Sequence, residues 1–351
     1  MVPVLHFRQR GYLSFFIQYA CLSLICILSY AESSMKQNRK QGRQEEKTKL
    51  QFVGIPSVNA TRQSISRDIR SFINNVIAGD CLDILPHIPD GSLDMILCNL
   101  PFGTTQNTWD SPIDIHKLWQ HYERIIKPNG AIVPNAHGLF TARLIMSNEK
   151  LFKYKICWIK SKATNFLNAK KQPLRKHEDI CVFYKKQPLY NPQLSNGTPY
   201  TKGVRKAQET GSYGAFKPVL VESSTGTRLP TDVIYFRTAE SEGTVWHPTQ
   251  KPVSLGQYLI KTFTNPGALI LDNACGSGSY LVAAVKEGRN FIGIEKNVLT
   301  ESCKGEPIDY IKLCRERIMD AYRNKLHKNM KKYLHTVNLF AASSYQKRKA
   351  S

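Results

Sequence analysis

Acidic residues are scarce in this chain: 27 Asp and Glu stand against 49 Lys and Arg, which gives a formal net charge of +22. So large an excess of positive charge argues against a typical metabolic enzyme and favours a polyanionic partner, most plausibly nucleic acid. A basic but otherwise ordinary soluble surface is the alternative. The hydrophobic content of 42% is sufficient for a folded core.

Paired cysteines are missing as well. Nine cysteines are scattered without the paired spacing of a metal site, so no zinc centre is expected. Several of them, including Cys98, Cys157 and Cys181, lie within apolar runs. They are typical of reduced core thiols, and the sequence therefore predicts a cytoplasmic protein.

One long apolar run, residues 11–31, follows Arg8 and Arg10 and has the layout of a signal peptide or a single membrane anchor. Because a nucleic-acid enzyme must reach its substrate, we favour an incorrectly assigned start codon or a non-functional extension ahead of Met35. Secretion or anchoring is the other interpretation, but no membrane contact is expected. Residues 35–70 are polar and predict a flexible lead-in.

A short apolar segment, residues 94–98, predicts a buried strand that stops abruptly at Asn99-Leu100-Pro101-Phe102. In open α/β sheets, ligands bind at the carboxyl ends of the strands. There Asn99 offers an oxygen acceptor, Pro101 fixes the direction of the Leu100 carbonyl, and Phe102 offers a flat face. This combination suits an exocyclic amine on a planar base, although these four residues alone are more typical of an ordinary strand-to-loop turn.

A glycine-rich turn, residues 273–279, joins a predicted strand at residues 268–272 to a predicted helix at residues 280–287. Its pattern is Asp-x-x-x-Gly-x-Gly and lacks the Gly-x-Gly-x-x-Gly of dinucleotide sites. The next strand, residues 290–295, ends in Glu295, which could accept from both hydroxyls of a ribose. The turn therefore favours a nucleoside cofactor without a pyrophosphate, such as S-adenosylmethionine, over a nicotinamide dinucleotide.

The segments between these motifs alternate between strand and helix patterns, which predicts a parallel sheet. Residues 154–160 and 179–184 predict an antiparallel pair, and residues 127–130 predict a turn. Residues 190–243 have weak periodicity and predict an irregular insertion without its own core. From residue 308 onward, a basic helix is expected to fade into a disordered end.

Taken together, the motifs resemble those of the β class of DNA amino-methyltransferases, especially phage and restriction-associated members, which act on adenine N6 or cytosine N4. Residues 99–102 match the catalytic (Asp/Asn/Ser)-x-Pro-(Tyr/Phe) motif, and residues 272–278 match the cofactor loop. The order of catalytic motif, recognition insert and cofactor loop also agrees. Residues 247–252 are similar to the segment that leads into that loop, and the resemblance covers about residues 75–319.

The resemblance implies a Rossmann-like α/β methyltransferase fold, circularly permuted, with a seven-stranded, mostly parallel sheet, one antiparallel hairpin and a DNA-recognition insert. The organisation expected is a lead-in over residues 1–70, a catalytic half over 71–189, a target-recognition insert over 190–245, the cofactor half of the same domain over 246–322, and a basic tail over 323–351.

The same resemblance assigns the site residues. Those expected to bind S-adenosylmethionine are Asp80, Lys251, Asp272, Ala274, Gly276, Gly278 and Glu295. The catalytic set is Asn99, Leu100, Pro101 and Phe102. Basic residues in and before the insert interleave with polar and aromatic ones, which suits DNA contact, and the set chosen is Lys170, Lys171, Arg175, Lys202 and Arg205. Two departures are Ala274, where the family often has a larger apolar residue, and Phe102 in place of the commoner Tyr.

The predicted activity is site-specific methylation of adenine N6 in double-stranded DNA by base flipping, without a metal. Cytosine-N4 methylation is the nearest alternative. An RNA methyltransferase of similar fold is disfavoured by the motif order and the long insert, and a catalytically dead DNA-binding prophage relic is disfavoured by the intact motifs. A restriction endonuclease partner, and either a monomer or a homodimer, are compatible with this assignment.

Overall fold

The computed structural model describes residues 69–104, 110–212, 214–296, 299–301 and 307–349. The chain divides into two compact units, Met1–Ser64 and Ile65–Ser351, and only the second contains described residues. The apolar run at residues 11–31 lies outside the described residues. Within the described part, no helix is both long and apolar enough to cross a bilayer.

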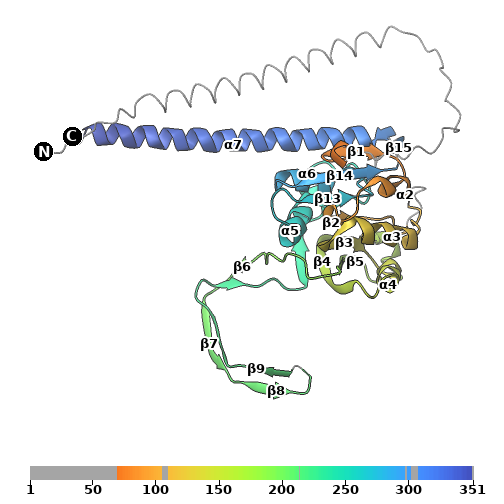
Figure 1. The fold of residues 1–351 in the computed structure, drawn as a ribbon, viewed down its shortest axis with the longest axis horizontal. Helices are drawn as coiled ribbons and strands as arrows, with labels where there is room; N and C mark the ends of the chain where they lie inside the picture. Colours follow the sequence, from red (N-terminus) through yellow and green to blue (C-terminus); the bar gives the residue numbers. More distant parts are fainter. Residues whose placement is uncertain (1–68, 105–109, 213, 297–298, 302–306, 350–351) are drawn as a thin grey trace, which may run out of the picture. The chain divides into compact units, whose positions relative to one another are not determined.

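An eight-stranded sheet forms the centre of the second unit (Figure 1). The strands follow in the order β1 (Asn75–Ala78), β14 (Asn290–Glu295), β13 (Leu269–Asp272), β2 (Leu93–Cys98), β3 (Ile126–Ala136), β5 (Arg175–Phe183), β4 (Phe152–Thr164) and β12 (Val233–Phe236). Every neighbouring pair is parallel except the two that involve β5. The predicted α/β class with a mostly parallel sheet and one antiparallel hairpin is thereby confirmed.

The described sheet has eight strands where seven were expected, because β12 joins its edge. Val233 of β12 pairs with Cys157 of β4, 76 positions earlier in the chain. The residues of β12, Val-Ile-Tyr-Phe, are strong strand formers, but the run is short and lies in the segment that was expected to be irregular. Pairing with β4 places it in the sheet.

Helices cover both faces of the sheet: α2 (Cys81–Ile84), α3 (Ile115–Ile125), α4 (Leu139–Met146), α5 (Val253–Phe263), α6 (Ser279–Lys286) and α7 (Tyr310–Lys349). Along β2, Met95 and Leu97 belong to the core under α5, α6 and the first turns of α7, while Ile96 and Cys98 belong to the core under α2 and α3. This alternation is the two-residue period of a strand whose two faces are both covered. Short 3₁₀ turns occur at η1 (Ile69–Ser71), η2 (Leu85–His87), η3 (Phe166–Asn168) and η4 (Ala239–Glu242).

The two sequence motifs become neighbours because β2 and β13 pair in parallel, with Met95 opposite Ile270 and Ile96 opposite Leu271. Asp94 ties the start of this pair, since its carboxylate accepts a hydrogen bond from the Leu269 amide at 2.8 Å. The carboxyl ends of both strands therefore open onto the same edge of the sheet, as expected from the sequence.

Two local expectations were wrong. Residues 127–130, expected as a turn, belong to β3, where they form a bulge: Leu93 pairs with Ile126 but Met95 pairs with Ala131. The helix α7 continues to Lys349 without the expected disordered end. Its first part is anchored by Cys314, Ile318 and Ala321, which are buried in the core shared with α6.

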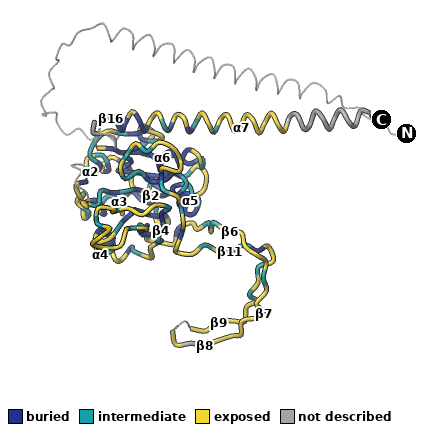
Figure 2. Tube along the Cα trace, turned by 180° about the vertical axis from the view of Figure 1, so that it is seen from behind, coloured by how far each residue is buried: buried dark blue, intermediate teal, exposed yellow. Residues whose placement is uncertain are grey.

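The insert contains three small antiparallel ribbons outside the main sheet. They pair β6 (Ser195–Asn196) with β11 (Thr227–Arg228), β7 (Tyr200–Arg205) with β10 (Val219–Ser223), and β8 (Gln208–Thr210) with β9 (Gly214–Phe216). Most of their described residues are exposed, as Figure 2 shows. A last ribbon, β15 (Leu299–Glu301) with β16 (Pro307–Asp309), precedes α7.

Candidate active site

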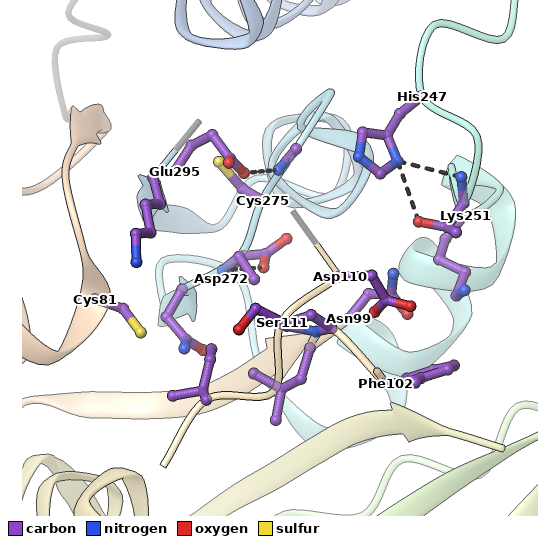
Figure 3. Close-up of a pocket in the computed structure, with 18 of the residues that line it drawn as sticks. Cys81, Asn99, Phe102, Asp110, Ser111, His247, Lys251, Asp272, Cys275 and Glu295 are labelled. Atoms are coloured by element: carbon purple, nitrogen blue, oxygen red, sulfur yellow. Dashed lines mark hydrogen bonds between the residues drawn. The ribbon is translucent and has the colours of Figure 1, made fainter. Parts of the chain in front are cut away.

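A pocket of about 330 Å³ lies at the carboxyl ends of β1, β2, β13 and β14 (Figure 3). Its wall includes all four residues of the predicted catalytic motif, and most of the residues expected around the cofactor: Asp80, Lys251, Asp272, Ala274, Gly276 and Glu295. The volume is within the range of sites that enclose a small organic ligand. Phe102 and Lys251 lie together on one side of the pocket, and Cys81 and Glu295 lie on the other.

Two amide atoms of this wall, Asn99 Oδ1 and Asn273 Nδ2, have unsatisfied hydrogen-bonding capacity. Oδ1 is buried and has no hydrogen-bond partner in the described structure. A buried acceptor without a donor costs about 1–3 kcal/mol of stability, and a ligand that donates a hydrogen bond to Oδ1 would remove this cost. The loop that follows is fixed by Asp110, whose two carboxylate oxygens accept the Gly103 and Thr104 amides, each at 2.9 Å.

The aromatic ring of the motif already has neighbours. The Phe102 ring stacks on Phe140 with centroids 5.0 Å apart and an interplanar angle of 27°. The Lys251 ammonium lies over the Phe102 ring, 5.7 Å from its centroid, and forms an ion pair with Glu178 at 3.0 Å. Lys251, which was expected to serve the cofactor, therefore has its charge on the Phe102 side of the pocket.

Two carboxylates, Asp80 and Glu295, end the strands on the opposite side. Glu295 accepts a hydrogen bond from the Gly276 amide at 2.6 Å and so holds the glycine turn against the end of β14. Asp80 caps α2 by accepting from the Leu82 amide at 2.9 Å and pairs with Lys296. The hydrogen bond from Lys296 is the main reason that the pKa of Asp80 is lowered.

Asp272 is the most perturbed acid of the pocket. Complete burial, with a further contribution from the nearby Glu295 charge, raises its pKa to about 8, although the Ala274 amide opposes this by donating to its carboxyl. Burial thus favours the neutral, protonated form of the Asp272 carboxyl. A cationic group brought next to Asp272 would favour loss of that proton.

This shift predicts a pH dependence of stability. The unfolded chain releases the Asp272 proton near pH 4, whereas the folded chain keeps it up to about pH 8. The free energy of unfolding of the ligand-free protein should therefore fall across that window and level off above it. Urea unfolding at a series of pH values should show a shallower fall for Asp272→Asn, and equal slopes for the two proteins would contradict the assignment.

Gly278, expected at the cofactor, does not line the pocket. Its φ of +77° is left-handed, and a β-carbon there would overlap the Cys314 sulfur of α7. The second glycine of the turn thus allows α7 to pack against α6. Gly276, with φ of +48°, remains at the pocket wall, where a β-carbon would meet only the His247 ring at 3.5 Å.

Sequence reasoning missed several wall residues. The His247 ring faces Gly276 and packs on the Tyr310 ring, with the two ring centroids 4.9 Å apart. Burial lowers the pKa of this imidazole to about 4. Asn273 accepts a hydrogen bond from the Tyr122 hydroxyl at 2.6 Å. Asp110 could have been proposed from the sequence, because it is the first acidic residue after the catalytic motif and the loop that follows the motif needs acceptors for its amides. The tyrosine contact depends on packing between distant segments and had no local signal.

The basic residues predicted to bind DNA are not part of the pocket wall. Lys170 and Lys171 are exposed between β4 and β5, and Arg175 begins β5. Lys202 and Arg205 lie on β7, with their charges over the rings of Tyr200 and Phe216. The structure thus divides the five residues between the sheet edge and a ribbon of the insert. Among the described side chains, no group of three or more His, Cys, Asp or Glu is placed to hold a metal ion.

An open α/β sheet with a ligand-sized pocket at a central pair of strand ends defines a class of small-molecule-binding enzymes. Comparison with known proteins places the chain within that class. Residues 93–299 match the family model of the N6/N4 DNA methylases, and the chain belongs to this DNA methylase family. The predicted DNA amino-methyltransferase family is thereby confirmed.

The chain is also similar to individual known proteins. The Type II methyltransferase M.BglII, recorded from Bacillus subtilis, is 26% identical over 271 residues, which is 68% of this chain and 71% of the relative. Among solved structures, an M1.HpyAVI–SAM complex matches 69% of this chain and 98% of its own, with 20% identity and a TM-score of 0.45. The PvuII DNA methyltransferase (cytosine-N4-specific) matches 72% and 92%, with 16% identity and a TM-score of 0.47.

Proposed function

We propose that this DNA methyltransferase transfers a methyl group from S-adenosylmethionine to the N6 amine of adenine in double-stranded DNA. The observation that carries the proposal is the buried Asn99 oxygen without a partner, at the strand end next to the glycine turn. An amide oxygen in this position is suited to accept a hydrogen bond from an exocyclic amine of a flipped base.

The pocket residues fit the proposed cofactor. Glu295 ends β14 where a ribose would lie, Gly276 lets the backbone approach a ligand, and Asp272 offers a buried carboxyl to a cationic group. Bound S-adenosylmethionine supplies an electrophilic methyl group on a sulfonium. Asp80 closes the end of β1 near the expected position of the cofactor adenine.

On the substrate side, Asn99 Oδ1 and the Leu100 carbonyl would accept the two N–H bonds of the amine. The lone pair of such a nitrogen is delocalised into the base, and these acceptors favour a tetrahedral nitrogen with the lone pair directed at the methyl group. They also stabilise the positive charge that develops on nitrogen, since they are already oriented before reaction. Pro101 keeps the Leu100 carbonyl in place.

Phe102 would contact the flipped base through its ring, with base stacking worth about 1–3 kcal/mol. Because Phe140 and the Lys251 ammonium already lie against this ring, the base must share it with them. Flipping itself costs a few kcal/mol, so the ring would recover a substantial part of that cost.

Adenine is preferred because Asn followed by Pro-Phe is more typical of adenine enzymes in the family that the sequence resembles, where cytosine-N4 enzymes often have Ser. The test is to express the full chain in a host without endogenous adenine or cytosine methylation and to digest its DNA for mass spectrometry. N6-methyladenine is expected. If N4-methylcytosine is found instead, the methylated amine is cytosine N4. Unmodified DNA would refute both the adenine and the cytosine assignment.

The exposed loop between β4 and β5 is proposed to contact the DNA backbone. Replacing both Lys170 and Lys171 with glutamine should weaken DNA binding and lower the slope of log K against log salt by roughly 1 for each lost phosphate contact. Fluorescence anisotropy at several salt concentrations measures this slope.

Lys286 provides the matched control, because it is exposed at the far end of α6 from the pocket. Lys286→Gln should leave the slope unchanged. If the double variant has the wild-type slope, the DNA surface lies on other basic residues, such as Lys202 and Arg205 of the insert.

A further inference from the structure

A second polar group of side chains lies beside the pocket, and the proposed chemistry does not use it. It comprises His137, Lys160, Asn165, Arg175 and Glu178, here called the edge cluster. Strand register brings its members together: Ala136 pairs with Asp179, Trp158 with Glu178, and Thr164 with Arg175. Because β3 and β4 run parallel to β2, the cluster lies at the same edge of the sheet as Asn99.

The edge cluster carries more positive than negative charge. Glu178 pairs with Lys160 at 3.3 Å and with Lys251 at 3.0 Å, and these ammonium groups keep its pKa below the usual value despite its burial. Among the described residues, no carboxylate lies within ion-pair distance of Arg175. Two cations thus pair with Glu178, and the Arg175 guanidinium adds a third positive charge that acts on Lys160, an arrangement that favours a bound anion.

Hydrogen-bonding groups of the edge cluster are also unsatisfied. His137 Nδ1, Asn165 Nδ2 and Arg175 Nε are buried atoms without a partner in the described structure. The last two can only donate, and a neutral imidazole can carry its proton on Nδ1. Asn165 is moreover held in a left-handed conformation, with φ of +71°. Unpaired donors beside an excess of positive charge are the complement of an oxyanion.

From this geometry, and on the basis of the proposed function, we infer that the edge cluster binds one phosphodiester group of the substrate strand, at or next to the target nucleotide. Lys251 connects the two sites, since its ammonium contacts both Glu178 of the cluster and the Phe102 ring of the pocket. A base that reaches Asn99 past this ring brings its own backbone along the same edge. The Arg175 guanidinium and the Asn165 amide hold the phosphate by charge and by hydrogen bonds.

The experiment couples a change in the protein to a change in the DNA. Once modified bases have identified the recognition sequence, duplexes are made in which a neutral methylphosphonate replaces one phosphate at a time around the target nucleotide. For the wild-type protein, one position is expected to lower kcat/KM by about 10- to 100-fold, as expected for a lost hydrogen bond to a charged group. Arg175→Gln should lower kcat/KM on unmodified DNA by a similar factor. On the duplex with the methylphosphonate at that position, the kcat/KM of the variant should fall little further.

Two further variants complete the test. Asn165→Gly removes the amide donor, and glycine readily adopts the left-handed backbone of this position. The methylphosphonate that lowers kcat/KM for the wild type should therefore have a smaller effect on this variant too, though the difference should be weaker than for Arg175→Gln. This variant carries the test if Arg175→Gln does not fold. For the control Lys286→Gln, the methylphosphonate at each position should lower kcat/KM by the same factor as for the wild type. The inference would be overturned if, at all positions, the methylphosphonate lowered kcat/KM by the same factor for Arg175→Gln and Asn165→Gly as for the wild type. Failure of the proposed function is distinguishable, because the wild-type protein would then methylate none of the duplexes.

Discussion

Asn99→Ala is expected to lower the rate of methyl transfer by about 100- to 1,000-fold, the usual cost of removing one preoriented group that stabilises developing charge. The Asn99 oxygen is buried and has no hydrogen-bond partner among the described residues, so it is available to the reacting amine. Its contribution should appear mainly in kcat, because the hydrogen bond strengthens as nitrogen becomes positive. Single-turnover assays with tritiated cofactor measure this rate directly.

Binding provides the controls for that variant. Cofactor affinity should stay near normal, because the glycine turn and the strand-end carboxylates come from other segments of the chain. DNA affinity should also persist, since phosphate contacts dominate it. Asn99→Asp keeps an oxygen acceptor and should retain more activity than Asn99→Ala. A fully active Asn99→Ala enzyme would show that the amine is held by other groups.

Gly276→Val is expected to abolish S-adenosylmethionine binding measured by calorimetry. The residue has a φ of +48° at the pocket wall, a backbone conformation that a β-branched side chain strongly disfavours. Valine should therefore move the turn away from the position in which the Gly276 amide donates to Glu295. Both the approach of the backbone to the ligand and the orientation of Glu295 would be lost.

Strain alone is controlled by Gly267→Val. Gly267 also has a left-handed φ, +85°, with no atom within 4 Å of an added β-carbon, but it precedes β13 at the opposite end of the strand. Gly267→Val should lower the free energy of unfolding without changing the affinity for S-adenosylmethionine. Tight binding by a folded Gly276→Val protein would refute the assignment of the glycine turn to the cofactor, as would equal loss of binding in both variants.

The sequence alone determined the elements whose stability is mainly local. The apolar pattern of residues 290–295 predicted β14 with the bounds observed. The Asp80 cap of α2 is equally local, because a cap needs only a side-chain oxygen and the amides two or three residues on. The motif residues could likewise be chosen from residue type, since Asn99 directly follows an apolar strand and Gly276 lies in the glycine-rich turn after another.

Tertiary structure decided what depends on distant partners. The edge strand β12 exists because β4 pairs with it, Gly278 serves helix packing because Cys314 of α7 lies against it, and Lys251 turns its charge toward Glu178. None of these contacts leaves a pattern within a window of the sequence, because each joins segments 36 to 76 positions apart. The unpaired donors of the edge cluster follow the same rule: they become meaningful only when three strand ends bring them together.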